Sequence, residues 1–195
     1  DELGQRFEIS FNTYKPFACG IVIHPSIDAC VQLRERGVTP DQIERIDLRV
    51  HSLVLELTGK KEPKDGLQGK FSVYHGCAAG LIYGRAGEDE FSDAVVNDPL
   101  VVQTRNKVQA VVDDGIDEAA VRVSALLKNG ERVDVNVEHA IGSLQKPLTD
   151  AQLQAKFNAL VVPVLGQARA DDITMTCWQL GKLPDVRVLT KMCHA

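Results

Sequence analysis

Two side chains that can bind an anion precede a predicted helix near the start of the chain. Lys15 opens the segment Lys15-Pro16-Phe17-Ala18-Cys19-Gly20, and His24 stands directly before Pro25. Proline suits the first helical position, where its missing N–H costs nothing, and Gly37 supplies a stop signal. A helix N-terminus presents free N–H groups and a partial positive charge. Together with the lysine charge and the titratable histidine, this segment predicts a binding site for a carboxylate.

Both side chains also have an ordinary structural interpretation. A lysine is by default a solvated surface residue, and His24 could cap the helix or pack as a structural histidine. The lysines between residues 60 and 64 form either a solvated loop or a surface that steers an anionic substrate. The place of Lys15 just before a helix start is the observation that favours a binding role.

A second candidate lies on an apolar stretch from Phe71 to Ile82, whose many small residues predict a buried helix. His75 lies on this stretch, between Val73 and Cys77. A histidine at such a position can hold a charge or transfer a proton near neutral pH. A packed core histidine is the alternative interpretation, and the sequence leaves both open.

The composition excludes several classes of protein. A formal net charge of −5 gives no electrostatic reason to expect nucleic-acid binding. No apolar run approaches the roughly 20 residues needed to span a bilayer, and no secretory signal is visible. The five cysteines are scattered without a CxxC pair, so we expect no metal site and instead buried, reduced thiols in a cytoplasmic protein. Because the chain opens at Asp1 without an initiator methionine, we expect a fragment or a processed product.

Alternating apolar and polar residues predict several strands. The alternation predicts strands over residues 7–11, 46–50 and 108–112. The clearest signal is a hairpin between residues 121 and 138, in which Asn129-Gly130 favours a type I′ turn and residues 108–112 supply a neighbouring strand. The hairpin has one apolar face, as expected for a sheet that packs on helices.

Punctuating residues divide the rest of the chain. Thr39-Pro40-Asp41-Gln42 and Thr149-Asp150-Ala151-Gln152 have the form of capping boxes, and Pro99 opens another helical piece. Residues 58–69 are predicted to form an exposed, mobile loop, and residues 142–147 a linker. The helix after Thr149 carries an apolar stripe. The stripe comprises Leu153, Phe157, Leu160, Val161 and Val164. We therefore predict an α+β domain over residues 1–144, with a mainly antiparallel sheet and helices on one face, and a helical tail over residues 145–195.

Four segments, taken together and in this order, resemble the C-terminal part of the MmgE/PrpD family, which includes 2-methylcitrate dehydratases, cis-aconitate decarboxylases and an iminodisuccinate epimerase. The segments are Lys15-Pro16-Phe17 with His24-Pro25-Ser26-Ile27-Asp28-Ala29; Thr58-Gly59-Lys60 through Gly66-Leu67-Gln68-Gly69-Lys70-Phe71-Ser72; Asn97-Asp98-Pro99 leading to Lys107-Val108; and His139-Ala140-Ile141-Gly142-Ser143 with Pro147-Leu148-Thr149-Asp150 and Ala155-Lys156-Phe157. They span nearly the whole chain, although each is weak on its own.

The resemblance implies a lid domain that closes an active site against a large N-terminal helical domain, which this sequence lacks. It implies that Lys15 binds substrate, and we add His24 and Lys70 as substrate-binding candidates. Many members have a tyrosine four residues after the phenylalanine matched by Phe71. Here that position is His75 with Tyr74 beside it, and both are catalytic candidates.

The expected function is that of a cofactor-independent lyase, similar to 2-methylcitrate dehydratase, that removes a proton alpha to a carboxylate of a small polycarboxylate. We expect a cytoplasmic homodimer without metal, cofactor, nucleic acid or membrane partner, and an inactive fragment when the helical domain is missing. An epimerase or decarboxylase of the same family shares the carbanion-like step. A non-catalytic α+β interaction module is the alternative of a different class.

Overall fold

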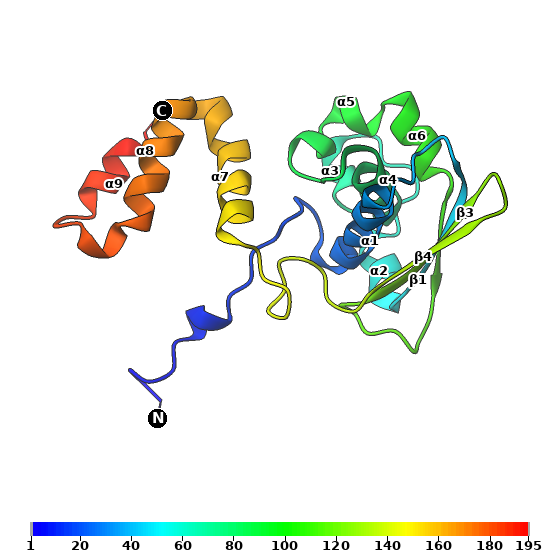
Figure 1. The fold of residues 1–195 in the computed structure, drawn as a ribbon, viewed down its shortest axis with the longest axis horizontal. Helices are drawn as coiled ribbons and strands as arrows, with labels where there is room; N and C mark the ends of the chain where they lie inside the picture. Colours follow the sequence, from blue (N-terminus) through cyan, green and yellow to red (C-terminus); the bar gives the residue numbers. More distant parts are fainter. Residues whose placement is uncertain (1, 195) are drawn as a thin grey trace. The chain divides into compact units, whose positions relative to one another are not determined.

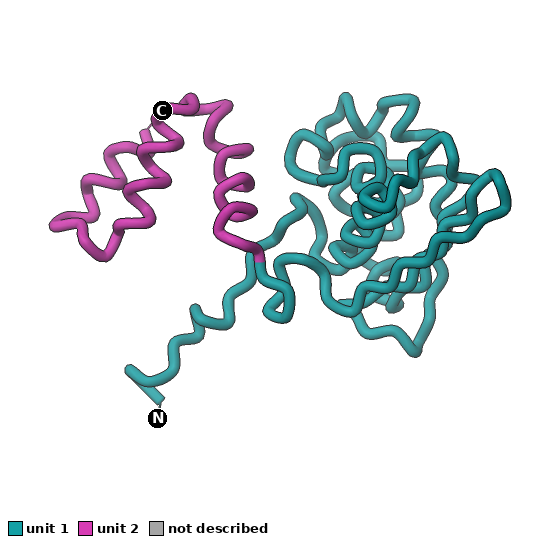
Figure 2. The backbone as a smooth tube through the Cα atoms, in the orientation of Figure 1, with its two compact units in different colours: residues 1–147 teal, residues 148–195 magenta. Residues whose placement is uncertain are grey.

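The computed structural model describes residues 2–194, and the chain divides into two compact units, residues 1–147 and residues 148–195 (Figure 2). Unit 1 holds a mixed β-sheet with helices, and unit 2 is helical (Figure 1). The α+β fold class predicted from the sequence is therefore confirmed. Among the described residues, no helix combines the length and the apolar character needed to cross a bilayer.

Four strands form the sheet within the described residues, in the order β2-β1-β3-β4. They are β1 (Ile43–Val50), β2 (Val108–Val112), β3 (Val121–Leu127) and β4 (Arg132–Val137). The pairs β1–β3 and β3–β4 are antiparallel, whereas β1 and β2 run parallel. Leu48 lies opposite Val123, and both are buried, whereas their neighbours Arg49 and Arg122 are exposed. This alternation gives the sheet one buried and one solvated face.

The helices of unit 1 pack on the sheet or on one another (Figure 1). They are α1 (His24–Glu35), α2 (Ser52–Thr58), α3 (Gly66–Gly69), α4 (Val73–Tyr83), α5 (Asp93–Val96) and α6 (Pro99–Arg105), with the 3₁₀ turns η1 (Glu8–Phe11), η2 (Ile21–Ile23) and η3 (Asp89–Phe91). α1 contacts β3, β4 and α4. As predicted, Pro25 lies in the first turn of α1, and the chain turns away at Gly37, whose φ is +86°.

Close packing of α1 on α4 forms the centre of unit 1. A Cβ added at Gly80 would lie 2.9 Å from the carbonyl oxygen of Ile27, and one added at Gly76 would lie 3.0 Å from the Ile27 side chain. The two glycines of α4 therefore let the helix backbones approach each other. Leu33 and Leu81 are completely buried beside this contact. The core thus fixes α1, whose first turn carries the candidate site.

Unit 2 contains α7 (Asp150–Leu165), α8 (Gln167–Trp178), η4 (Leu180–Lys182) and α9 (Arg187–Met192). The capping box predicted at the start of α7 is confirmed, because Thr149 accepts the Gln152 backbone N–H through its hydroxyl and donates its own N–H to the Gln152 side chain. α7 contains no buried residue. Only Ala170 and Ile173 are buried among the described residues of unit 2.

The strand predicted over residues 7–11 is wrong. Glu8–Phe11 forms the 3₁₀ turn η1, and its apolar residues are exposed, including Ile9 at 79% and Phe11 at 52%. Alternation predicts a strand only where one face can be buried against a sheet. No described strand pairs with this segment.

Residues 58–69 are more ordered than the predicted loop. Residues 60–62 are exposed, but Gly66–Gly69 forms α3, which the Asp65 side chain caps by accepting the Gln68 N–H at 2.8 Å. Gly66 is buried, and a side chain has no room there, because a Cβ would lie 2.0 Å from the Phe91 carbonyl oxygen. The glycines that suggested mobility instead allow close backbone contact.

The predicted hairpin is confirmed as β3–β4, but its turn and its neighbour differ from the prediction. Among the described residues only glycines have positive φ, so Asn129 does not adopt the conformation that a type I′ turn requires. Gly130, at φ +87°, instead donates its N–H to the Leu127 carbonyl, as in a type I turn followed by a glycine bulge. The neighbour of the hairpin is β1, and β2 lies on the far side of β1.

Candidate functional site

Lys15 and His24 line one pocket of about 370 Å³ in unit 1. Three segments supply its walls: the chain before and at the start of α1, the loop between β2 and β3, and the segment after β4. The lining residues are Thr13, Tyr14, Lys15, Ile21, Val22, His24, Pro25, Glu118, Ala119 and residues 140–145. This volume suits a small organic ligand. The structure thus brings together two of the predicted site residues, while Lys70, Tyr74 and His75 lie outside the lining.

Lys15 and Lys70 both lie near Cys19. The Lys15 ammonium group donates a hydrogen bond to the Cys19 carbonyl oxygen at 3.2 Å, and the Gly20 N–H donates to the Lys70 carbonyl oxygen at 3.2 Å. Burial raises the pKa of the Cys19 thiol to about 12, although the positive charges of Lys15 and Lys70 act in the opposite direction. Cys19 is therefore a protonated packing residue, and the two lysines provide the positive charge of this region.

The Lys70 ammonium group is only part-exposed and pairs with the Glu88 carboxylate at 2.6 Å. Lys15 is exposed and has one carbonyl acceptor, which leaves donors for a ligand. Of the two lysines, Lys15 is therefore the one that lines the pocket, and among the described residues its ammonium group has no carboxylate within 4 Å.

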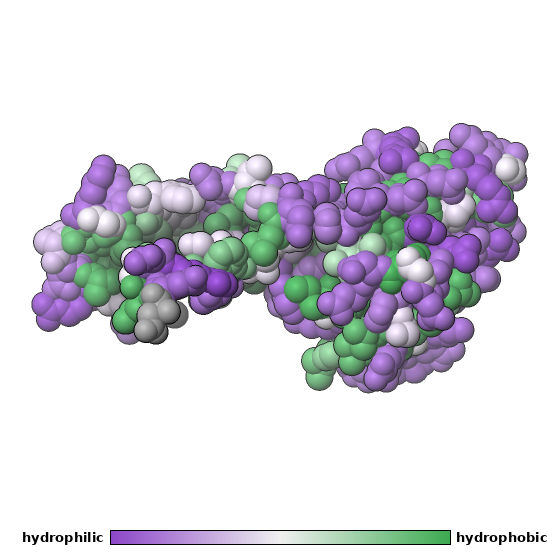
Figure 3. All heavy atoms as spheres, turned by 90° about the horizontal axis from the view of Figure 1, so that it is seen from below, coloured by the Kyte–Doolittle hydropathy of each residue, from purple (hydrophilic) through white to green (hydrophobic). Residues whose placement is uncertain are grey.

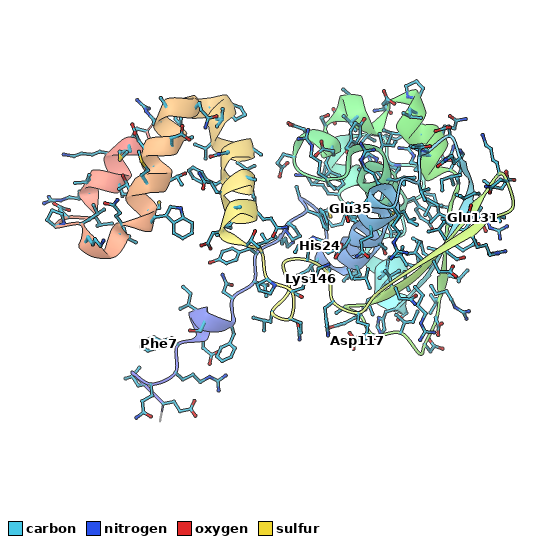
Figure 4. All side chains as sticks on the ribbon, in the orientation of Figure 1. Phe7, His24, Glu35, Asp117, Glu131 and Lys146 are labelled. Carbon is cyan, nitrogen blue, oxygen red and sulfur yellow. The ribbon has the colours of Figure 1, made fainter. Side chains whose placement is uncertain are left out.

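His24 is the first residue of α1 and is buried. Its ring meets the Phe17 ring edge to face, with the centroids 5.4 Å apart. Ile23 occupies the N-cap position and provides no capping side chain, so the first turn of α1 begins without one. Figure 4 shows His24 at the start of α1. The pocket is therefore lined by an exposed lysine, a buried histidine and the start of α1, where the His24 N–H donates to the Ile21 carbonyl oxygen and Pro25 has no N–H. The lysine is the positively charged group that suits an anion.

Tyr74 and His75 lie side by side in α4 but face different surroundings. His75 is completely buried, with its Nε2 2.8 Å from the Glu90 carbonyl oxygen and its ring 5.3 Å from that of Phe91. Burial lowers the pKa of His75, which is neutral as a result. Burial also raises the pKa of Tyr74, whose ring has the Lys61 ammonium group 5.9 Å from its centroid. Their proposed acid–base roles stay predictions.

Residues 142–145 of the segment predicted as a linker also line the pocket, and the boundary between the two units follows this segment at Pro147. Gly142 has φ +88°, and a Cβ there would lie 2.4 Å from the Tyr14 carbonyl oxygen. The buried Asp28 carboxylate accepts the Ile141 N–H and the Lys146 ammonium group. Sequence reasoning missed Asp28 as a site residue. Its spacing of four from His24, which places both on one face of α1, was the available signal.

Comparison with known proteins shows which proteins this chain is similar to. The MmgE/PrpD C-terminal domain matches residues 17–180. Cis-aconitate decarboxylase of Mus musculus is 25% identical over 190 residues, which cover 92% of this chain and 38% of that protein. The 2-methylcitrate dehydratase of Yarrowia lipolytica mitochondria is 25% identical over 126 residues, 59% of this chain and 24% of that protein. The Homo sapiens cis-aconitate decarboxylase is 24% identical over 189 residues, 92% of this chain and 39% of that protein.

Unit 1 is an α+β domain whose pocket is lined by a lysine, a histidine and the start of a helix. The chain belongs to the MmgE/PrpD family and corresponds to its C-terminal domain. The chain spans about two fifths of the length of the cis-aconitate decarboxylases it matches. Relatives of this family include a dehydratase and decarboxylases, and the identities near 25% do not separate these activities.

Proposed function

We propose that this chain is the C-terminal portion of a cofactor-independent lyase that acts on a small polycarboxylate, as a 2-methylcitrate dehydratase does. The observation that carries the proposal is the shared pocket of Lys15 and His24 in a chain of the MmgE/PrpD family. Lys15 binds a substrate carboxylate, and His24 and the first turn of α1 complete the binding site. Lys70 adds positive charge nearby.

The proposed reaction begins with removal of a proton alpha to a carboxylate. The negative charge that develops on the substrate is stabilised by the ammonium groups and the helix N–H groups. Tyr74 and His75 are the proposed acid–base residues of this chain, on the strength of the family position that they occupy. Decarboxylation or epimerisation uses a related carbanion-like intermediate, and the similarity to cis-aconitate decarboxylases supports decarboxylation as the second candidate.

The chain spans about two fifths of the length of the cis-aconitate decarboxylases, which supports a further domain in the whole protein. We propose that an N-terminal helical domain supplies the remaining acid–base groups, that α7 and the helices after it pack on that domain, and that the whole protein is a homodimer. Residues 1–195 alone would then lack lyase activity. The free, buried thiols of Cys19, Cys30 and Cys77 support a reducing, cytoplasmic location.

Replacement of Lys15 by alanine tests the proposal in the longer protein. Loss of a charge-assisted hydrogen bond costs about 1.5–3 kcal/mol, so kcat/KM for 2-methylcitrate or cis-aconitate should fall about ten-fold or more. The fold should be intact because the Lys15 side chain is exposed and makes a single hydrogen bond among the described residues. Steady-state kinetics and thermal unfolding measure the two effects.

Lys128→Ala is the matched control, because Lys128 is also exposed but does not line the pocket. It should leave kcat/KM within about two-fold of the wild type, as expected for a surface lysine. Wild-type kinetics for Lys15→Ala, or equal losses in both variants, would show that the proposed site is wrong.

A further inference from the structure

Asp28 is a buried carboxylate that faces three donors. It lies on α1, one turn after His24, and its side chain is 7% exposed. One carboxylate oxygen accepts the Ile141 N–H at 2.8 Å and the Lys146 ammonium group at 3.2 Å, and the other accepts the Gln32 amide at 3.2 Å. Two of these donors belong to the segment after β4, far from Asp28 in the sequence. Asp28 therefore ties that segment to α1.

Ile141 and Lys146, the two donors that follow β4, lie at the two ends of a closed loop. Gly142 donates its N–H to the Lys146 carbonyl oxygen at 2.7 Å, and Lys146 donates its N–H to the Ser143 hydroxyl at 3.1 Å. Residues 141–146 thus form a compact loop that Asp28 holds at its beginning through Ile141 and at its end through Lys146. Residues 140–145 of this loop region line the pocket.

The same loop presses on the backbone that carries Lys15. Position 142 must be a glycine, because a Cβ there would lie 2.4 Å from the Tyr14 carbonyl oxygen and 2.7 Å from the Pro16 ring. Tyr14 and Pro16 are the chain neighbours of Lys15. A continuous set of contacts therefore leads from Asp28 through the Gly142 loop to the backbone on both sides of Lys15.

We propose that Asp28 is a positioning residue, which holds the 141–146 loop against Tyr14 and Pro16 and so fixes both the pocket wall and the location of the Lys15 ammonium group. The part of this inference that concerns ligand binding rests on the proposed function of Lys15. A buried carboxylate with backbone and ammonium donors suits this role, because charge-assisted hydrogen bonds in a dry environment are strong and directional.

Asp28→Asn tests the tether with little change of volume. The amide carries no charge, so the Lys146 ammonium group loses its ionic partner, and only one oxygen is left for the three donors. In the chain of residues 1–195, hydrogen exchange of residues 140–146 and 13–16 should become about ten-fold faster or more, while exchange in β1, β3 and α4 stays unchanged. Asp98→Asn is the matched control. Asp98 also accepts two backbone N–H groups, at the start of α6, and it does not line the pocket.

Gly142→Ala gives a second test that does not depend on whether Asp28→Asn folds. Its Cβ should displace the Lys15 segment and speed exchange of residues 13–16, because the φ of +88° and the contact with Tyr14 both oppose it. Unchanged exchange of residues 13–16 in either folded variant would overturn the proposed coupling.

Citrate, a small tricarboxylate, serves as the probe of the ligand-binding part. Asp28→Asn should weaken citrate binding about ten-fold in the wild-type background and clearly less in a Lys15→Ala background, because a large part of its effect acts through Lys15. Additive losses would mean that Asp28 has a merely structural role and would overturn the proposal. If citrate does not bind the wild-type chain, the ligand-binding part of this inference is overturned, and the hydrogen-exchange measurements alone decide the positioning role. The proposed function itself is decided by the Lys15→Ala kinetics of the longer protein.

Discussion

His75 is a neutral histidine in the core of unit 1. Its burial lowers its pKa below the ordinary 6.5, and its Nε2 lies within hydrogen-bonding distance of the Glu90 carbonyl oxygen. The unfolded chain binds a proton at His75 near pH 6.5, whereas the folded chain binds it only at lower pH. The contribution of His75 to stability is therefore complete above about pH 6.5 and is lost as the pH falls toward the folded pKa.

His75→Gln should remove this pH dependence, because glutamine does not titrate and can still donate to Glu90. In the wild type the free energy of unfolding should fall, between pH 6.5 and the folded pKa, by up to about 1.4 kcal/mol for each pH unit through His75. Urea unfolding between pH 5 and pH 8 measures the difference, with the exposed His139→Gln as control. Equal slopes in wild type and His75→Gln would contradict this account.

The residue types near the site could be predicted from the sequence, but their contacts could not. Lys15 and His24 were singled out because they flank a helix start, and the pocket contains both. Asp28 lies in the same stretch of sequence, yet its importance depends on Ile141 and Lys146, which only the folded chain brings close. Local patterns carry no information on such distant donors.

Helices and hairpins were the most predictable elements because their signals are local. α1, the hairpin β3–β4 and the capping box of α7 all follow from residues within a few positions of each other. The predictions were wrong where the structure of a segment depends on partners that are remote in sequence. Residues 8–11 alternate like a strand but have no sheet to join, and β2 pairs with β1, which is remote in sequence.

The glycine face of α4 yields a prediction at the level of elements. Gly80→Ala adds a Cβ 2.9 Å from the Ile27 carbonyl oxygen, which belongs to the backbone of α1 and cannot rotate away. Alanine gains up to about 1 kcal/mol in helix propensity, but the overpacking of two helices outweighs it, so we expect a net loss of about 1–2 kcal/mol. Chemical denaturation measures this loss.

Gly181→Ala is the control for this prediction, because a Cβ at Gly181 meets nothing within 4 Å and its φ is not positive. It should change stability by less than about 0.5 kcal/mol. An unfolding free energy for Gly80→Ala equal to or above that of the wild type would show that α1 and α4 can separate without cost.

Considered as a whole, the molecule leaves much apolar surface in contact with solvent. The stripe on α7 contains Leu160 at 48% exposure and Val164 at 68%, and in α8 Trp178 is 57% exposed. Apolar side chains are visible between polar ones on the surface in Figure 3. Exposed apolar surface of this kind marks an association site or an aggregation liability.

We expect residues 1–195 to self-associate through residues 150–180 when nothing else covers the stripe. Phe157→Glu places a charge in the stripe and should shift the chain toward the monomer, as measured by sedimentation or light scattering. Ala155→Glu is the control, because Ala155 is exposed and lies on the opposite side of α7 by helical periodicity. A parent chain that is monomeric, and whose mass Phe157→Glu does not change, would refute the expectation.

The parallel pairing of β1 with β2 has a consequence for the time that unit 1 needs to fold. Ile46 pairs with Val108, and all of α2 to α6 lies between them in the chain. The hairpin β3–β4 can close locally, but β2 can join the sheet only after this long connection has been brought together. Closing a long loop costs entropy before its contacts form, and such non-local topologies fold slowly. β1 also pairs with β3 across a separation at least as long, as between Val50 and Val121. The joining of β1 and β2 to the local hairpin is thus expected to be the late event in folding.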